Sequence, residues 1–168
     1  MEGNTHTEFE KLRLASIVDG LPLAIEVIEP IGPIYGVIQI SHGMAEHIAR
    51  YRDFMQFLSA HGYVVAIHDH RGHGGSVRDV SDLGYFYTDN AQVIVEDLHD
   101  VTAFLQKRYP GYPIYMFSHS MGTLVARNYL KRYDHELACD GMPSIWNAKS
   151  SPSTTRSSRP KWMANSSP

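Results

Sequence analysis

The segment from Ile114 to Tyr133 constrains the fold of this chain more than any other. It opens with the short apolar run Ile114–Phe117, which is typical of a strand buried in a sheet. The turn residues Ser118-His119-Ser120 follow, and from Met121 the apolar side chains recur at the spacing of a helix. A buried strand that passes into a helix through so short a turn predicts one unit of an α/β fold.

Strands and helices alternate in the same way along the preceding part of the chain. A first pair of strands is expected to form a hairpin about the turn Asp19-Gly20, and Gly62 is placed to cap the end of a helix. Because such alternation implies crossovers between parallel strands, we expect an α/β fold with a mostly parallel sheet and flanking helices. The expected strands are 9–16, 23–29, 35–40 and 63–67, and the expected helices are 51–61 and 91–109.

The composition is that of an ordinary globular domain, with 43% hydrophobic and 20% charged residues. The single cysteine, Cys139, cannot form an internal disulfide, which excludes a disulfide-stapled scaffold. No apolar run reaches the roughly 18 residues of a membrane span, and the first residues lack the apolar core of a signal peptide. We therefore expect a cytoplasmic protein. A net charge of −3 gives no reason to expect a nucleic-acid partner.

The end of the chain differs in chemistry from the rest. Residues 144–168 hold eight serines, three prolines and four basic residues but no acidic one, which leaves a net charge of −7 on residues 1–143. Such a segment buries too little apolar surface to offset the entropy of ordering it. We expect a disordered N-terminus at 1–7, a folded domain at 8–138 and a basic, disordered tail at 139–168. The alternative for the tail is a basic patch that binds an acidic partner.

Ser120 is the candidate catalytic residue of the strand–turn–helix segment. In a nucleophile elbow, a serine stands in a strained turn, and the residues two positions before and after it must be small. Here these are Ser118, where glycine is usual, and Gly122. The helix that follows directs its first N–H groups toward a developing oxyanion. The alternative is a plain tight turn.

Three further motifs precede this turn. They are H-G-M-A-E-H at 42–47, D-H-R-G-H-G-G-S at 69–76 and L-G-Y-F at 83–86, and H-S-M-G follows at 119–122. In order and spacing these motifs resemble those of the α/β-hydrolase superfamily, and within it the branch of monoacylglycerol lipases, lysophospholipases and serine aminopeptidases. The resemblance covers residues 8–138.

The resemblance implies a role for each matching residue. Ser120 matches the nucleophile that accepts the acyl group, and the backbone N–H groups of Met44 and Met121 match the two donors of the oxyanion hole. Losing one such donor costs about 2.7–4 kcal/mol of transition-state stabilisation. The resemblance implies no cofactor. Residues that would support the elbow and its neighbouring loops are Ser118, His119, Gly122, His42, Gly43, Asp69, Arg71, Gly72, His73 and Gly74.

The histidines near these motifs allow another interpretation. Histidines and carboxylates close together in sequence are typical of zinc hydrolases, but a site here would need further ligands from elsewhere. Because the resemblance explains these residues as a turn, we expect no metal. Glu46 and His47 are interpreted as packing groups of their loop rather than as acid or base. The cluster is His68, Asp69, His70 and His73, and the downstream candidates are His99, His119 and His135.

A serine hydroxyl needs an adjacent base, and in this superfamily the triad acid and histidine follow the serine along the chain. The last histidine, His135, is placed in the helix after the elbow, where it cannot act as the base. The downstream acids Asp134, Glu136 and Asp140 follow no buried strand, so we expect neither triad partner in this chain. We hypothesise that residues up to 138 are the N-terminal part of a hydrolase, joined to a foreign tail by a frameshift, a premature stop or a gene-prediction error.

Two functions therefore remain open. The first is a serine hydrolase that cleaves lipid-like esters, monoacylglycerols or lysophospholipids, through an acyl-enzyme, with peptide N-termini as an alternative substrate. The second is a catalytically incomplete fragment or pseudo-enzyme that binds a ligand or partner. Because the strand before Ser120 lies inside the complete sheet of the family, here it would form an exposed edge. We expect self-association through that edge.

Overall fold

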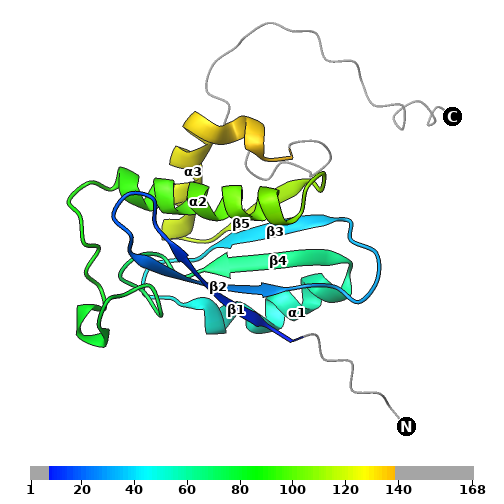
Figure 1. Cartoon of the computed structure of the whole chain (residues 1–168), viewed down its shortest axis with the longest axis horizontal. Coiled ribbons are helices and arrows are strands. Elements are labelled where there is room, and N and C mark those ends of the chain that lie inside the picture. The colour runs from blue at the N-terminus through cyan, green and yellow to red at the C-terminus, as the bar shows by residue number, and fades with distance from the viewer. Residues whose placement is uncertain (1–7, 139–168) are drawn as a thin grey trace, which may run out of the picture.

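The computed structural model describes residues 8–138, which form a five-stranded sheet with helices on both faces (Figure 1). The strands are Glu10–Ala15 (β1), Pro22–Ile28 (β2), Gly36–Ser41 (β3), Tyr63–His68 (β4) and Ile114–Ser118 (β5). They lie in the order β1-β2-β4-β3-β5. β3 pairs in parallel with β4 and β5, whereas β2 is antiparallel to both β1 and β4. The sheet is therefore mixed, with a parallel half that ends at β5.

Helices cover the two faces of this sheet. The helical segments are Ile48–Tyr51 (η1), Arg52–Ala60 (α1), Val80–Asp82 (η2), Gln92–Arg108 (α2), Met121–Tyr133 (α3) and Asp134–Glu136 (η3). α1 lies on one face, and α2 and α3 lie on the other (Figure 1).

Alternate residues of the parallel strands supply the two cores. Ile38 and Ile40 of β3 pack with Met55 of α1, and Val37 of β3 packs with Leu105 of α2. Successive strand residues point to opposite faces, so a strand between two helical layers must be apolar on both. Burying each such side chain contributes about 1.5–3 kcal/mol.

The predicted elements are confirmed within a few residues at each end. The first two strands form the expected antiparallel hairpin, and the predicted strand 63–67 is buried on both faces as β4. The helix that was expected from Tyr51 begins with a short 3₁₀ turn and then continues as α1. Gly62 has a φ of 91°, and its N–H donates to Ser59 O, as expected of a helix cap.

Two expectations are wrong. The strand described by its composition as buried at 114–117 is buried only at Ile114, and Phe117 is 40% exposed. The exposed edge expected for the same strand is confirmed, because β5 has a partner on one side only among the described residues. His135 lies outside the helix that follows the elbow, since α3 ends at Tyr133 and His135 belongs to η3.

Several expectations concern residues that the structure does not describe. These are the disordered N-terminus at 1–7, the tail at 139–168 and its origin, Cys139 and Asp140. Within residues 8–138, every helix is too short or too polar to cross a lipid bilayer.

Candidate active site

Ser120 stands between β5 and α3 in the strained backbone conformation expected of an elbow. Its φ of 52° and ψ of −122° lie outside the regions that residues with side chains favour. Such strain costs about 1–3 kcal/mol and persists only where the surrounding structure imposes it. The N–H of Gly122 donates to His119 O, and the N–H of Thr123 donates to Ser120 O. These bonds close the turn and leave Ser120 exposed to solvent.

Gly122 allows the first turn of α3 to touch the end of β3. A Cβ atom at position 122 would lie 2.1 Å from Ser41 O and 2.6 Å from His42 O, so no side chain fits there. Ser118 instead occupies a regular strand position, opposite Ser41 in the β3–β5 ladder. Position 122, two residues after Ser120, therefore accepts only glycine, whereas position 118, two residues before Ser120, accommodates a serine.

The loop that follows β3 lies against Ser120. A Cβ atom built on Gly43 would lie 3.1 Å from Ser120 Cβ. His42 Nδ1 donates to Gly43 O at 2.8 Å, which holds this peptide in place. Among residues 8–138, the N–H groups of Met44 and Met121 donate no hydrogen bond. The two amides that the resemblance assigns to an oxyanion hole belong to the residues that directly follow Gly43 and Ser120, and these two residues lie against each other.

Glu46 connects this loop to the nucleophile turn. Its Oε2 accepts hydrogen bonds from Gly43 N–H at 2.7 Å, from Tyr51 O–H at 2.7 Å and from His119 Nδ1 at 3.2 Å. Partial burial acts to raise the pKa of Glu46, but the hydrogen bonds from Tyr51, Gly43 and His119 outweigh it and lower the pKa to about 2. Glu46 is therefore a carboxylate across the physiological range.

The interpretation of Glu46 as a simple packing group missed this network. Glu46 and Tyr51 lie five residues apart, and nothing in that spacing predicts a shared contact with His119, which is 73 residues away in the chain. His47, treated in the same way, is exposed and lies beside η1.

Asp69 organises the glycine-rich loop after β4. Its carboxylate accepts the N–H of Ile48 at 2.8 Å and the N–H of Gly75 at 2.7 Å. Gly74, at a φ of 47°, lies so close that a Cβ would be 2.2 Å from Asp69 Oδ2. Gly72 has a φ of 75°, and a Cβ there would meet Tyr85 O at 2.5 Å. Asp69, Gly72 and Gly74 therefore hold the loop together through contacts within the loop and with η1 and Tyr85.

Arg71 is fully buried and joins three parts of the fold. Its guanidinium donates to the buried carboxylate of Asp97 in α2 at 2.6 and 3.0 Å, to Asp19 in the β1–β2 turn at 3.1 Å, and to Phe86 O at 3.2 Å. The side chains of Arg71 and Asp97 are both 0% exposed. The geometry therefore agrees with the expectation of loop support for Arg71.

Four buried histidines, at positions 42, 68, 70 and 73, have their rings in contact where β3 and β4 end. His42 Nε2 accepts the N–H of His70 at 2.9 Å, so its proton is on Nδ1. His73 Nδ1 bonds to Arg71 O. Burial lowers the pKa of His42, and it lowers the pKa of His68 to about 3, which keeps these rings neutral. No group of three or more His, Cys, Asp or Glu side chains in the described region has the arrangement of a metal site.

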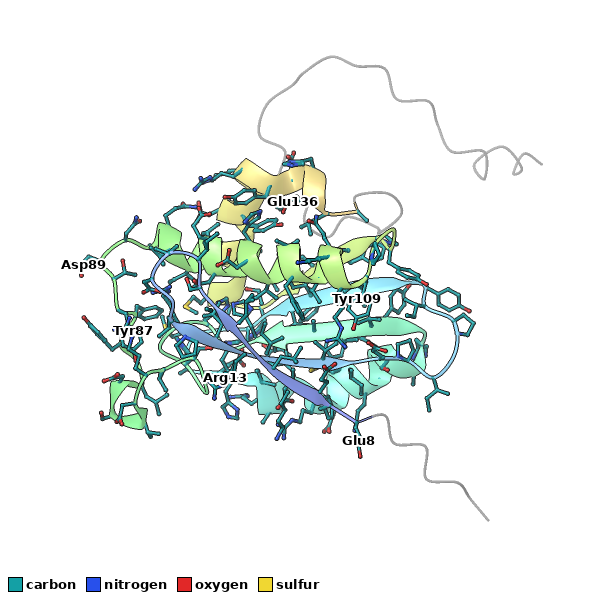
Figure 2. The ribbon with its side chains drawn as sticks, viewed as in Figure 1. Glu8, Arg13, Tyr87, Asp89, Tyr109 and Glu136 are labelled. Atoms are coloured by element: carbon teal, nitrogen blue, oxygen red, sulfur yellow. The ribbon has the colours of Figure 1, made fainter. Side chains whose placement is uncertain are left out.

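No base is in contact with the candidate nucleophile within residues 8–138. Ser120 Oγ makes no hydrogen bond there, and the nearest histidine in sequence, His119, directs Nδ1 to Glu46. His135 follows the 13 residues of α3, which place it roughly 20 Å from Ser120 at 1.5 Å per residue. Glu136, labelled in Figure 2 above α2, accepts hydrogen bonds from His99 and Tyr129 instead. Among the described residues, the candidate nucleophile Ser120 and the candidate oxyanion donors Met44 and Met121 therefore stand without a base in contact with Ser120.

An open groove of about 390 Å³ runs beside His119. Phe54 of α1 and Phe117 of β5 form its apolar floor, with ring centroids 5.0 Å apart. The remaining lining residues are Glu46, Arg50, Tyr51 and His119. The groove combines an aromatic surface with the Glu46 carboxylate and the imidazole of His119, the residue that precedes Ser120 in the chain.

A protein-family model described as "Serine aminopeptidase, S33" matches residues 32–143 of this chain. This range covers the loop at 42–46, the glycine-rich loop, the elbow and all of α3. The match therefore includes every motif that builds the site.

Curated relatives and a solved structure agree with this match. The chain is 34% identical over 108 residues to the monoglyceride lipase of Homo sapiens, covering 64% of this chain and 34% of that protein. It is 32% identical over 125 residues to the monoacylglycerol lipase of Mycolicibacterium smegmatis, covering 71% and 41%. The thermostable carboxyl esterase of Bacillus coagulans, solved with glycerol, superposes with a TM-score of 0.72 at 31% identity over 79% of this chain and 43% of that one.

The chain thus spans about a third of the length of the human relative that it matches. The matched part contains the parallel strands, the strained serine turn and the glycine contact that places the turn against β3. On this evidence the chain belongs to the α/β-hydrolase superfamily, in the branch of monoacylglycerol lipases, lysophospholipases and serine aminopeptidases.

Proposed function

We propose that this chain carries the nucleophile and oxyanion hole of a serine hydrolase that cleaves lipid-like carboxylic esters. The observation that carries the proposal is the backbone of Ser120, whose φ of 52° in a non-glycine residue holds the hydroxyl at an exposed turn. The amides of Met44 and Met121, which donate to no group among residues 8–138, supply the second requirement for acyl transfer.

The reaction assigned to this geometry is acyl transfer to Ser120. The Ser120 oxygen attacks the ester carbonyl carbon while a base takes its proton, and the carbonyl π electrons move onto the oxygen that the Met44 and Met121 amides stabilise. Collapse of this intermediate expels the alcohol, which takes a proton from the base, and leaves an acyl-enzyme. Water then attacks the acyl-enzyme in the same way and releases the carboxylic acid. Among residues 8–138, no side chain contacts Ser120 as the base of either step.

Monoacylglycerols are the substrates that we propose first. Two curated relatives are named as lipases of this ester class. The aromatic floor of Phe54 and Phe117 supports an apolar substrate, since aromatic side chains are typical linings of ligand sites. Lysophospholipids and peptide N-termini are the alternatives, because the same fold serves different reactions.

A fluorophosphonate probe tests the nucleophile directly. A full chain with an activated Ser120 is labelled at that residue, as located by peptide mass spectrometry, and loses labelling in Ser120→Ala. Ser118→Ala is the matched control, because it removes a hydroxyl two residues away that is not the nucleophile. Labelling at another serine, or labelling that survives in Ser120→Ala, would refute the assignment. Parallel assays with a monoacylglycerol, a lysophospholipid and an aminoacyl anilide separate the three substrate classes.

The second candidate function is that of a catalytically incomplete hydrolase that binds ligands without turnover. It is favoured by the absence of a base in contact with Ser120 within residues 8–138. Removing the base from a comparable triad costs on the order of a millionfold in kcat. A chain that binds a monoacylglycerol but is not labelled by the fluorophosphonate would have this second function.

A further inference from the structure

One oxygen of Glu46 receives three donors that come from three separate parts of the chain. Gly43 N–H belongs to the loop after β3, Tyr51 O–H to η1 and His119 to the turn that carries Ser120. The side chain of Glu46 is 12% exposed. Its other oxygen, Oε1, lies 3.7 Å from Arg50 Nε. Glu46 Oε2 therefore connects the loop after β3 and η1 to the turn that carries Ser120.

The hydrogen bond from Gly43 N–H to Glu46 determines which amide N–H groups of the loop after β3 remain without a partner among the described residues. Because Gly43 N–H donates to Glu46, it is not available to an oxyanion. The Gly43 carbonyl is held by His42 Nδ1 and by the N–H of Glu46 at 3.4 Å. With both polar atoms of this residue engaged, Ala45 takes a φ of 57° to complete the turn, and the N–H of Met44 is left free among the described residues.

The bond to His119 ties the same carboxylate to the elbow. The carbonyl of His119 accepts the N–H of Gly122, and its N–H donates to Ser41 O at 3.1 Å. The side chain of His119 is 59% exposed, so no packing would fix it without Glu46. Glu46 thus links the residue before the nucleophile to the residue before Met44.

We propose that Glu46 is a positioning residue that sets the oxyanion hole of this site, by removing Gly43 N–H from it and by holding Met44 N–H and Ser120 in register. This inference rests on the proposed function of Ser120. A carboxylate oxygen suits the role because an anionic acceptor takes several short donors at once. Glu46→Gln removes the negative charge and replaces one of the two acceptor oxygens by an NH₂ group, which cannot accept a bond from Gly43, Tyr51 or His119.

The test uses the full chain and two readouts. The first is hydrogen exchange at the Gly43 amide, which reports the Glu46 bond whether or not the protein is active. The second is the rate at which Ser120 reacts with a fluorophosphonate. In Glu46→Gln we expect Gly43 to exchange at least about tenfold faster. We expect labelling to slow by about 10- to 100-fold, since a misplacement of about 1 Å costs up to 100-fold in rate.

Two further variants complete the design. Asp53→Asn removes an exposed carboxylate at the start of α1 and should leave both readouts within twofold of the unmodified chain. Tyr51→Phe removes one of the three donors while keeping the ring, so it should slow labelling by a smaller factor than Glu46→Gln. Its milder change keeps the proposal testable if Glu46→Gln does not fold.

The outcomes separate the two proposals. Failure of the unmodified chain to label refutes the proposed function, and the exchange of Gly43 then decides alone whether Glu46 holds the loop. Unchanged exchange at Gly43 in Glu46→Gln overturns the positioning role. So does faster exchange with labelling at the rate of the unmodified chain, because the loop would then be held for a reason unrelated to the nucleophile.

Discussion

Replacing Gly122 by alanine sets two physical effects against each other. In an unobstructed helix, alanine is about 1 kcal/mol more favourable than glycine, so helix propensity alone predicts a stabilised protein. At this position the new Cβ would lie 2.1 Å from Ser41 O and 2.6 Å from His42 O. Both atoms are backbone and cannot rotate away, so α3 must move outward by about 1 Å to reach an ordinary contact.

Overpacking of this kind costs typically about 1–3 kcal/mol, and more when only backbone atoms can yield. We therefore expect Gly122→Ala to lose about 2 kcal/mol of unfolding free energy, which for a domain of this size lowers Tm by about 6–10 °C. The same displacement moves Ser120 away from Gly43, so fluorophosphonate labelling should slow by about 100-fold.

Urea denaturation followed by circular dichroism, together with the labelling rate, measures both effects. Leu124→Ala is the control, because it places an alanine in the same helix at a side chain that is 60% exposed, and it should change stability by less than about 0.5 kcal/mol. A Gly122→Ala protein that is as stable as the unmodified chain, and that labels at the same rate, would refute the steric argument for this elbow.

Three further predictions follow from the same structure. Arg71→Met should cost about 3–5 kcal/mol by urea denaturation, because it leaves the fully buried carboxylate of Asp97 without its cation; a loss below 1 kcal/mol would contradict this. The pKa of Glu46 is lowered from 4.5 to about 2, so the stability that Glu46 contributes is present above pH 4.5 and is lost as pH falls toward 2. The urea midpoint should therefore fall more steeply between pH 5 and pH 3 in the unmodified chain than in Glu46→Gln, and parallel curves would count against the network. Finally, β5 has a partner on one side only within residues 8–138, and Phe117 is 40% exposed beside it; we expect self-association in size-exclusion chromatography that Phe117→Lys weakens, whereas a concentration-independent monomer would exclude it.

Much of the fold follows from local patterns that can be read in order along the chain. The continuous, β-branched apolar run that became β4 is typical of a strand covered on both faces, because Gly62 ends the helix before it and the glycine-rich loop follows it. The elbow was predictable for a similar reason. Ser120 lies between a strand and a helix with Gly122 two residues later, and that local pattern is enough to recognise the turn. The atoms that exclude a side chain at Gly122, Ser41 O and His42 O, belong to the distant end of β3.

β5 shows that local composition alone does not predict exposure; the exposed edge was expected only from the resemblance, whose sheet continues beyond this strand. The apolar composition of Ile114–Phe117 is typical of a buried strand with neighbouring strands on both sides. Burial depends on which elements lie beside a strand, and in residues 8–138 only β3 does. A sequence pattern records the environment that a segment is suited to, not whether the rest of the fold supplies it.

The α/β class, the order of the elements and Ser120 as the candidate nucleophile could be predicted from the sequence, because they depend on periodicity and on spacing within a few residues. The surroundings of that serine could not, because they depend on contacts between distant parts of the chain. Glu46 meets His119 across 73 positions of the chain, and Arg71 meets Asp19 across 52. Such polar contacts depend on the relative placement of loops that the sheet brings together, and each costs desolvation that only a fully formed set of partners offsets. The hydrogen-bond partners of a carboxylate in a loop motif therefore cannot be predicted from the sequence alone.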